Sequence, residues 1–301
     1  MPTNLPRTAL TWAVLYGCVR VWFALGNAPD WKFPGGDLMI PDWAAVLVCV
    51  VSAGAVIALG RRPRSRLLIR SLWVLAAVWV AAAALALLDV VGGVLPGLGV
   101  PFDLSGMLSR LAALCGAALL GRTALIYQRR LGPGRSLQVT PAWAVIGAWT
   151  AVAGCLIRLA AQAVVGFDST PYGASLSLVL FEGGFLLAGI VLPLLLVYRV
   201  GRFFPRWMLL LPGAGLGGGI SAYFGVGLLQ MIAAALQGDP VYGGVGLPNA
   251  FFWVAVPAYL VWGVGLAVAT YGYHLRTRKP RTTEAVDEQG GGRDLLVKAD
   301  G

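Results

Sequence analysis

Apolar runs of about 20 residues follow one another along almost the whole chain, and each is long enough for a helix to cross the hydrocarbon core of a bilayer. Within lipid, only helices and closed barrels satisfy every backbone polar group, and the alternating pattern of a membrane barrel is absent from the sequence. Hydrophobic residues make up 58% of the chain and charged residues 12%, whereas a soluble domain carries about 25% charged residues. The sequence therefore predicts an all-α integral membrane protein.

Eight transmembrane helices are predicted, with connections that alternate in charge. The connections that follow the even-numbered spans are rich in arginine, whereas the others carry aspartates. By the positive-inside rule the basic side is cytoplasmic, so both termini are expected inside the cell membrane. The net charge of +10 thus sets membrane orientation, and no nucleic-acid partner is expected. The predicted spans cover residues 9–26, 43–60, 71–91, 104–127, 141–165, 175–197, 207–236 and 250–273.

The two halves of the chain resemble each other, which predicts a tandem 4+4 repeat. A glycine–cysteine pair, an arginine, a glycine and an aspartate occur in this order in residues 16–30 and again in residues 153–168. Four spans is an even number, so both repeats enter the membrane from the same side and are parallel. The predicted divisions are residues 1–135 for the first repeat, 136–278 for the second, and 279–301 for a disordered cytoplasmic tail.

Three arginines interrupt the apolar runs near the outer side of the membrane: Arg20, Arg110 and Arg158. An uncompensated arginine at such depth costs at least about 2.5 kcal/mol, so these side chains should face the bundle interior. The acidic residues before the tail also belong to the outer half of the protein. Asp89 at the end of the third span and Glu182 in the sixth are the predicted partners of the arginines.

Two further polar residues lie one helical turn from these arginines. Tyr16 precedes Arg20 by four residues, and Gln162 follows Arg158 by four, which places each pair on one helix face. We expect these two residues to line one polar pocket together with the three arginines and their acidic partners, to which Asp42 is added. The pocket opens outward and is shared by the two halves.

The predicted pocket supports two main interpretations. The first is the binding or passage of a small solute or ion, with the arginines as electrostatic anchors and the acids as counter-charges or proton carriers. The second is a structural or accessory membrane protein whose buried ion pairs only stabilise the bundle. An enzyme that acts on lipids is a third, less favoured alternative. The lipid bilayer is the expected partner, and the oligomeric state is left open.

No cofactor or metal site is predicted. His274 is the only histidine, and the four cysteines form no CxxC pair. Residues 213–218, "GAGLGG", match a dinucleotide-binding pattern but follow no strand. We interpret these glycines as small residues that allow close helix packing, with an unwound membrane segment as the alternative.

The segment "YGCVRVWFALGNAPDW", residues 16–31, resembles the first span of uncharacterised multi-pass membrane proteins of actinobacteria. In that family a span with a tyrosine and a basic residue closes with Trp/Tyr-x-Ala-Leu-Gly before a Pro/Gly-rich outer loop. The chain departs from the pattern at Asn27, where glycine or histidine is usual. The resemblance covers about forty residues; it implies a bacterial inner-membrane location and adds no catalytic residue.

Overall fold

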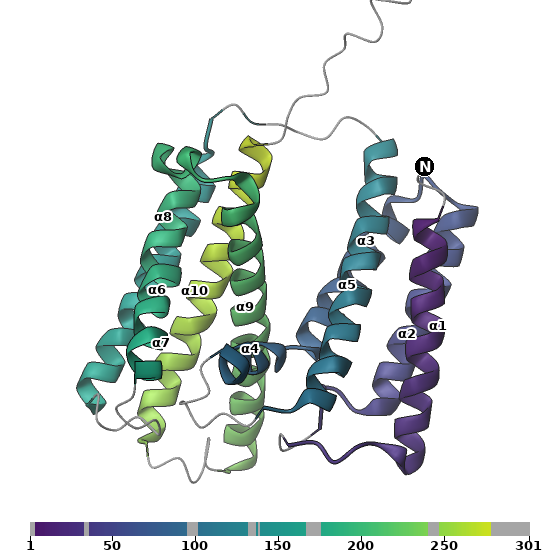
Figure 1. Cartoon of the computed structure of the whole chain (residues 1–301), viewed down its shortest axis with the longest axis horizontal. Helices are drawn as coiled ribbons and strands as arrows, with labels where there is room; N and C mark the ends of the chain where they lie inside the picture. Colours follow the sequence, from purple (N-terminus) through teal and green to yellow (C-terminus); the bar gives the residue numbers. More distant parts are fainter. Residues whose placement is uncertain are drawn as a thin grey trace, which may run out of the picture.

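The computed structural model describes residues 4–32, 36–94, 102–131, 137, 139–166, 176–239 and 247–277. Within these ranges every regular element is a helix, so the predicted all-α class is confirmed. The predicted cytoplasmic tail, residues 279–301, lies outside the described residues. The helices fall into two groups in Figure 1, one built from the first half of the chain and one from the second.

The first group holds the helices before residue 131. Helix α1 continues into a short π-helical turn, Phe23–Asn27, in which Gly26 adopts a φ of 93° and ends the helix. In this group α1 packs against α2 and α5, and α3 packs against α2 and α5. The helices are α1 (Leu5–Trp22), α2 (Asp42–Arg61), α3 (Arg66–Ala82), α4 (Ala86–Val94) and α5 (Leu104–Arg130).

The second group holds the helices after residue 141. Helix α10 packs against α6, α8 and α9, and α6 also packs against α8. A π-helical turn, Leu187–Val191, joins α7 to α8. The helices are α6 (Ala142–Val165), α7 (Leu176–Leu186), α8 (Leu192–Val197), α9 (Arg206–Gln237) and α10 (Asn249–Arg276), with a 3₁₀ turn at Arg199–Phe203.

Six of the described helices are long and apolar enough to cross a membrane, where the sequence predicts eight spans. The third predicted span consists of α3 and α4, which are bent by 45° at a break and make a seventh span if counted together. The sixth predicted span contains a shorter apolar helix, Glu182–Val197. Its π-helical turn ends just before Pro193, whose ring excludes the backbone carbonyl four residues earlier.

Helix α9 is continuous over its 32 residues, including the glycine-rich segment. The alternative of an unwound segment there is therefore wrong, because every residue of "GAGLGG" keeps its helical hydrogen bonding. The close-packing interpretation holds for one face of the helix only. A Cβ added at Gly217 would lie 2.8 Å from the backbone nitrogen of Ala267 on α10, whereas one added at Gly215 would meet no atom within 4 Å.

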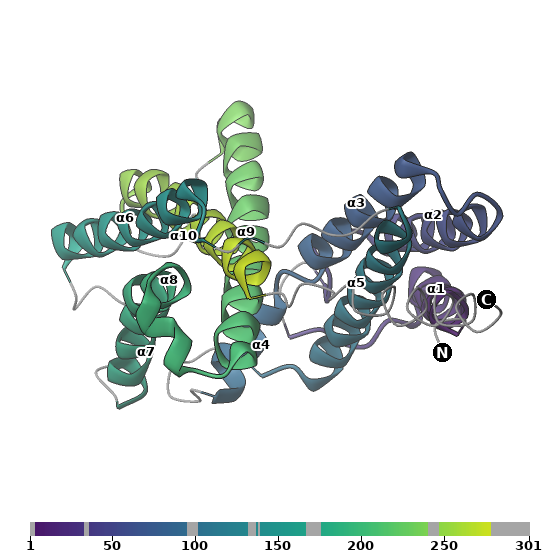
Figure 2. The ribbon, with the colours of Figure 1, turned by 90° about the horizontal axis from the view of Figure 1, so that it is seen from above.

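Each group of helices has its own hydrophobic core. One core consists of buried residues between Ala9 and Tyr127, and another of buried residues between Ala144 and Tyr273. Seen from above in Figure 2, α4 of the first group and α9 of the second lie side by side where the two groups meet. Helix α9 contacts both α3 and α4, and Leu87 of α4 packs against the second core. These contacts join the two halves.

Candidate functional site: three arginine-centred clusters

The first cluster surrounds Arg20 on α1, which is fully buried. Its guanidinium faces Asp37 in a bidentate pair, with Nη1 donating to Oδ1 at 3.0 Å and Nη2 donating to Oδ2 at 2.5 Å. Nη1 also donates to Oδ1 of Asp42 at 2.8 Å. Nη2 donates to the hydroxyls of Tyr16 and Ser109, each at 2.7 Å. We call these five residues the Arg20 cluster.

The partners of Arg20 come from three helices and a loop. Asp42 is the first residue of α2, where a carboxylate also interacts favourably with the helix dipole. Ser109 lies on α5, and its carbonyl and hydroxyl both lie within hydrogen-bonding distance of the Tyr16 hydroxyl. The Arg20 cluster therefore ties α1, α2 and α5 together at the end of the bundle that the sequence predicts to be outer. Two carboxylates face one guanidinium there, and that of Asp42 is 30% exposed.

The second cluster surrounds Arg110 on α5, which is also fully buried. Nη1 donates to Oδ1 of Asp89 on α4 at 3.2 Å, and Nη2 lies 3.6 Å from Oδ2 of Asp103. Nε donates to the backbone carbonyl of Gly106 at 3.1 Å. The backbone N–H of Lys32 donates to Asp103 Oδ2 at 3.2 Å, which brings the loop after α1 to this site. We call Arg110, Asp89, Asp103 and Lys32 the Arg110 cluster.

Asp103 is the N-cap residue of α5, because its Oδ1 accepts from the backbone N–H of Gly106 at 3.1 Å. Burial raises the pKa of this carboxyl, but the backbone N–H groups of Gly106 and Lys32 and the charge of Arg110 stabilise its anionic form. These opposing effects leave the pKa of Asp103 below its ordinary value. Asp103 is therefore held as a carboxylate.

The third cluster surrounds Arg158 on α6, and its guanidinium makes fewer hydrogen bonds than that of Arg20. Nε donates to the hydroxyl of Tyr259 on α10 at 2.8 Å, and Nη1 lies 3.5 Å from Oε1 of Glu182 on α7. The guanidinium carbon lies 4.6 Å from the ring centroid of Phe185, a cation–π distance. The side chain of Glu182 is 27% exposed. We call these four residues the Arg158 cluster.

The three arginines occupy separate clusters, so the single shared pocket predicted from the sequence is not formed around them. Arg20 and Arg158 share no polar partner among the residues that the structure describes. Their helices, α1 and α6, lie at opposite ends of the molecule in both Figure 1 and Figure 2. The physical reason is that each half closes its own core, and each arginine finds its carboxylates within its own half.

The remaining predicted residues have local roles. Tyr16 belongs to the Arg20 cluster, one turn before the arginine. Gln162 is buried, but its Nε2 donates to the backbone carbonyl of Gly166 at 3.0 Å and so closes the end of α6. This hydrogen bond satisfies a carbonyl beyond the helix end and does not involve Arg158. Gln162 is therefore a helix-terminating residue in this structure.

Several residues that complete the clusters were not singled out from the sequence. In the sequence Asp37 and Asp103 do not differ from the other outer aspartates, and their burial to 4% and 3% exposure distinguishes them only in three dimensions. Ser109 and Tyr259 carry hydroxyls inside long apolar helices, where the helix rotation decides whether they reach an arginine.

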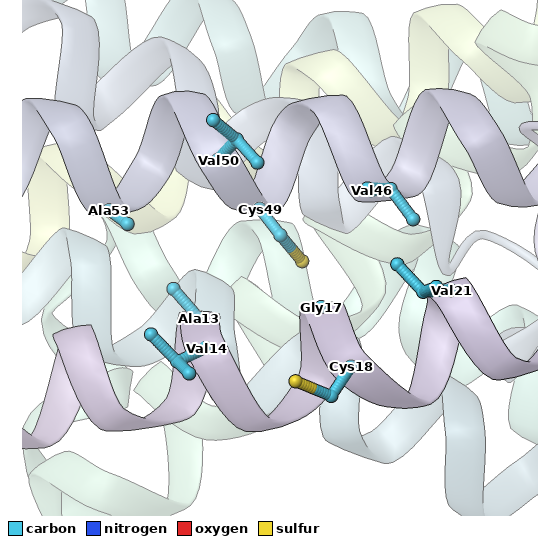
Figure 3. A pocket seen from close by; sticks show the side chains of 9 residues that line it. All are labelled: Ala13, Val14, Gly17, Cys18, Val21, Val46, Cys49, Val50 and Ala53. Carbon is cyan, nitrogen blue, oxygen red and sulfur yellow. The ribbon is translucent and has the colours of Figure 1, made fainter.

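Two surface hollows are apolar and lie apart from the clusters. One, of about 360 Å³, lies between α1 and α2, and its lining includes Gly17, Cys18 and Cys49 (Figure 3). The other, of about 500 Å³, includes Trp143 and Tyr271 in its lining. Neither is lined by any of the three arginines. Both linings consist mainly of apolar side chains, so neither hollow supplies a polar binding site.

Within the described ranges no three histidine, cysteine, aspartate or glutamate residues are grouped as a metal site would require. Neither a protein-family model, nor a curated protein, nor a solved structure matches the chain. The resemblance of residues 16–31 to actinobacterial membrane proteins therefore stays a prediction, and the clusters themselves carry the functional argument.

Proposed function

We propose that the chain is an eight-span membrane protein built as a parallel 4+4 repeat, and that it binds or conducts a small anionic solute at Arg158. In this assignment α3 with α4 forms the third span, and α7 with α8 forms the sixth. The bend in the former and the π-helical turn in the latter allow each pair to cross the membrane as one broken span.

The composition of two clusters supports the repeat. In the first half, an arginine on the first span contacts a carboxylate on the second span and a hydroxyl on the fourth: Arg20, Asp42 and Ser109. In the second half, Arg158, Glu182 and Tyr259 come from the first, second and fourth spans in the same way. The packing of first on fourth and of third on fourth spans also recurs in both halves.

The distribution of charge supports the proposed orientation. Arginines occupy the last turns of α2, α5 and α10 and the first residues of α3 and α9, whereas the buried aspartates of the first half lie at the opposite end of the bundle. By the positive-inside rule the arginine-rich end is cytoplasmic. We propose the plasma membrane of a bacterium as the location, with both termini inside.

The proposed solute site rests on a difference in hydrogen bonding between Arg20 and Arg158. Arg20 has two carboxylates and two hydroxyls, and 0% of its surface is exposed. Arg158 has one carboxylate at 3.5 Å and one hydroxyl, and among the described residues nothing accepts a hydrogen bond from its Nη2. A guanidinium recognises a carboxylate or phosphate by donating from two nitrogens. Arg158 retains this capacity, and Arg20 does not.

The surroundings of Arg158 suit an acid with an apolar portion. The aromatic rings of Phe185 and Tyr259 lie beside the guanidinium, and Trp262 packs against Phe185 with ring centroids 4.5 Å apart. These rings would cover the apolar part of a solute while its acidic group meets Arg158. Glu182, with a partly exposed side chain, is the group that such a solute would displace.

Binding of simple acids tests this function. Purified protein in lipid nanodiscs is titrated with benzoate, acetate or inorganic phosphate, and tryptophan fluorescence is followed because Trp262 lies beside the site. We expect a saturable change with benzoate, retained in Arg64→Gln and lost in Arg158→Gln. Arg64 is an exposed arginine of the α2–α3 connection, so its variant controls for lost positive charge. A change that persists in Arg158→Gln, or no change with any probe, would refute the proposal.

A structural role is the second candidate, and the burial of Arg20 and Arg110 between carboxylates favours it for the first half. Both are fully buried and each lies between two carboxylates. Buried ion pairs of this kind fix how helices pack, even where they add little net stability. If Arg158→Gln abolished folding as fully as Arg20→Leu, and the wild-type protein co-purified with a constant partner, the structural role would apply to the whole molecule.

A further inference from the structure

The Arg110 cluster contains more buried negative charge than positive charge. Asp89 and Asp103 are exposed by only 4% and 3%, and the guanidinium of Arg110 lies between them. The ammonium of Lys32 does not complete the balance, since its Nζ donates to the backbone carbonyl of Phe102 and the side chain is exposed. With both carboxyls ionised, this buried site would carry one uncompensated negative charge.

One oxygen of this cluster also lacks a hydrogen-bond partner. Oδ1 of Asp89 accepts from Arg110, but Oδ2 is buried and receives no hydrogen bond from any described residue. An anionic oxygen left without a donor in a low-dielectric site is among the costliest arrangements in a protein. A neutral hydroxyl in the same place costs much less. Oδ2 of Asp89 is therefore the atom at which a bound proton would remove the excess negative charge.

We infer that Asp89 is a proton-binding site and carries a proton on Oδ2 at neutral pH. The protonated carboxyl still accepts from Arg110 through Oδ1, and Arg110 is then balanced by Asp103 alone. A metal ion fits less well, because it would require several oxygen ligands and the described residues offer no group of three metal-binding side chains. The inference concerns the half of the molecule without the proposed solute site, and it stands whether or not Arg158 binds a solute.

The groups around Asp89 favour this assignment of the proton. Helix α5 contributes Arg110 and, at its N-terminus, Asp103. Helix α9, which contacts α4 from the other half, has no acidic or basic side chain between Trp207 and Gln237, and Tyr223 is its one titratable group there. Asp103 is held as the anion by backbone N–H groups from Gly106 and Lys32, so the proton belongs to Asp89. Its release would place an unbalanced charge beside the contact between the halves.

Infrared spectroscopy of the purified protein in lipid vesicles tests the inference. A protonated carboxyl has a C=O stretching band above the amide bands that shifts on deuteration. We expect one such band at neutral pH that is absent in Asp89→Asn and unchanged in Asp42→Asn, the matched change in the Arg20 cluster. In Asp103→Asn the band should be lost at a lower pH than in the wild type, because Arg110 then lacks its other carboxylate and stabilises ionised Asp89.

The thermal midpoint provides a second readout that does not depend on band assignment. Asparagine mimics a protonated aspartate, so Asp89→Asn should unfold within a few degrees of the wild-type midpoint at neutral pH, and the two midpoints should diverge as the pH rises. A neutral-pH spectrum without a band that depends on Asp89 would overturn the inference. So would a large loss of thermal stability in Asp89→Asn at neutral pH, since that loss would show an ionised Asp89 paired with Arg110.

Discussion

Arg20 and Asp37 face each other through two parallel hydrogen bonds, Nη1 to Oδ1 at 3.0 Å and Nη2 to Oδ2 at 2.5 Å, with neither side chain more than 5% exposed. A bidentate pair of this kind is directional as well as charged. It fixes the loop that contains Asp37 over the end of α1. The second carboxylate of the site, Asp42, makes a single contact and is 30% exposed.

This difference predicts unequal costs for two matched substitutions. Asp37→Asn removes the charge of the bidentate partner and should lower the free energy of unfolding by about 3–5 kcal/mol, as is usual when one partner of a buried pair is lost. Asp42→Asn should cost clearly less, because water screens this more exposed carboxylate and Asp37 still neutralises Arg20. Unfolding by sodium dodecyl sulfate in mixed micelles measures both. Equal losses would show that the bidentate geometry contributes nothing.

Two glycines on α9 allow a similar comparison of helix packing. Gly217→Ala would place a Cβ 2.8 Å from the backbone nitrogen of Ala267, and backbone cannot move aside as a flexible side chain can. We expect a loss of about 1–3 kcal/mol from the separation of α9 and α10. Gly215→Ala meets no atom within 4 Å and should cause no loss. The same micelle titration checks this pair, and a loss in both variants would contradict the packing shown here.

Much of the helical layout could be predicted from the sequence, because the thickness of a bilayer sets the length of an apolar run. The exceptions lie where helices break. Residues 81–86, "AAAALA", contain neither proline nor glycine, yet α3 ends at Ala82 and α4 begins at Ala86. The bend brings Asp89 to Arg110, so a tertiary hydrogen bond accompanies a break that local sequence does not signal.

The members of the candidate site were predictable in part, but its pairs and its layout were not. Few acids are available near the buried arginines, and all lie on the predicted outer side, so the sequence predicts Asp89 and Glu182 among their partners. Which arginine each acid contacts is seen only in the structure. The placement of Arg20 and Arg158 in separate clusters could not be derived, because a repeat in sequence does not say how far apart equivalent helices lie. The roles of hydroxyl groups depend on helix rotation, which apolar runs leave unspecified.

The tyrosine hydroxyls of the two halves should differ in importance. Tyr259→Phe removes the acceptor that Arg158 Nε reaches at 2.8 Å, while the stacked contact with Phe224, at 4.0 Å between ring centroids, remains. We expect a loss of about 1–2 kcal/mol in unfolding free energy. Tyr16→Phe should cost less, because Arg20 keeps both of its carboxylates. A greater loss in Tyr16→Phe would show that the hydroxyl orients Arg20 in a way its ion pairs do not.

The lowered pKa of Asp103 predicts how stability depends on pH. A carboxyl whose pKa is lower in the folded than in the unfolded state stabilises the fold fully at a pH above its unfolded-state pKa. This contribution is lost as the pH falls through the folded-state pKa. The window for Asp103 therefore lies below its ordinary pKa of 3.8. Asp103→Asn removes the charge but keeps a good N-cap for α5. The thermal midpoint of the wild type should exceed that of the variant at neutral pH, and the gap should close as the pH falls below this value. A gap that is constant with pH would show that the charge of Asp103 does not stabilise the fold.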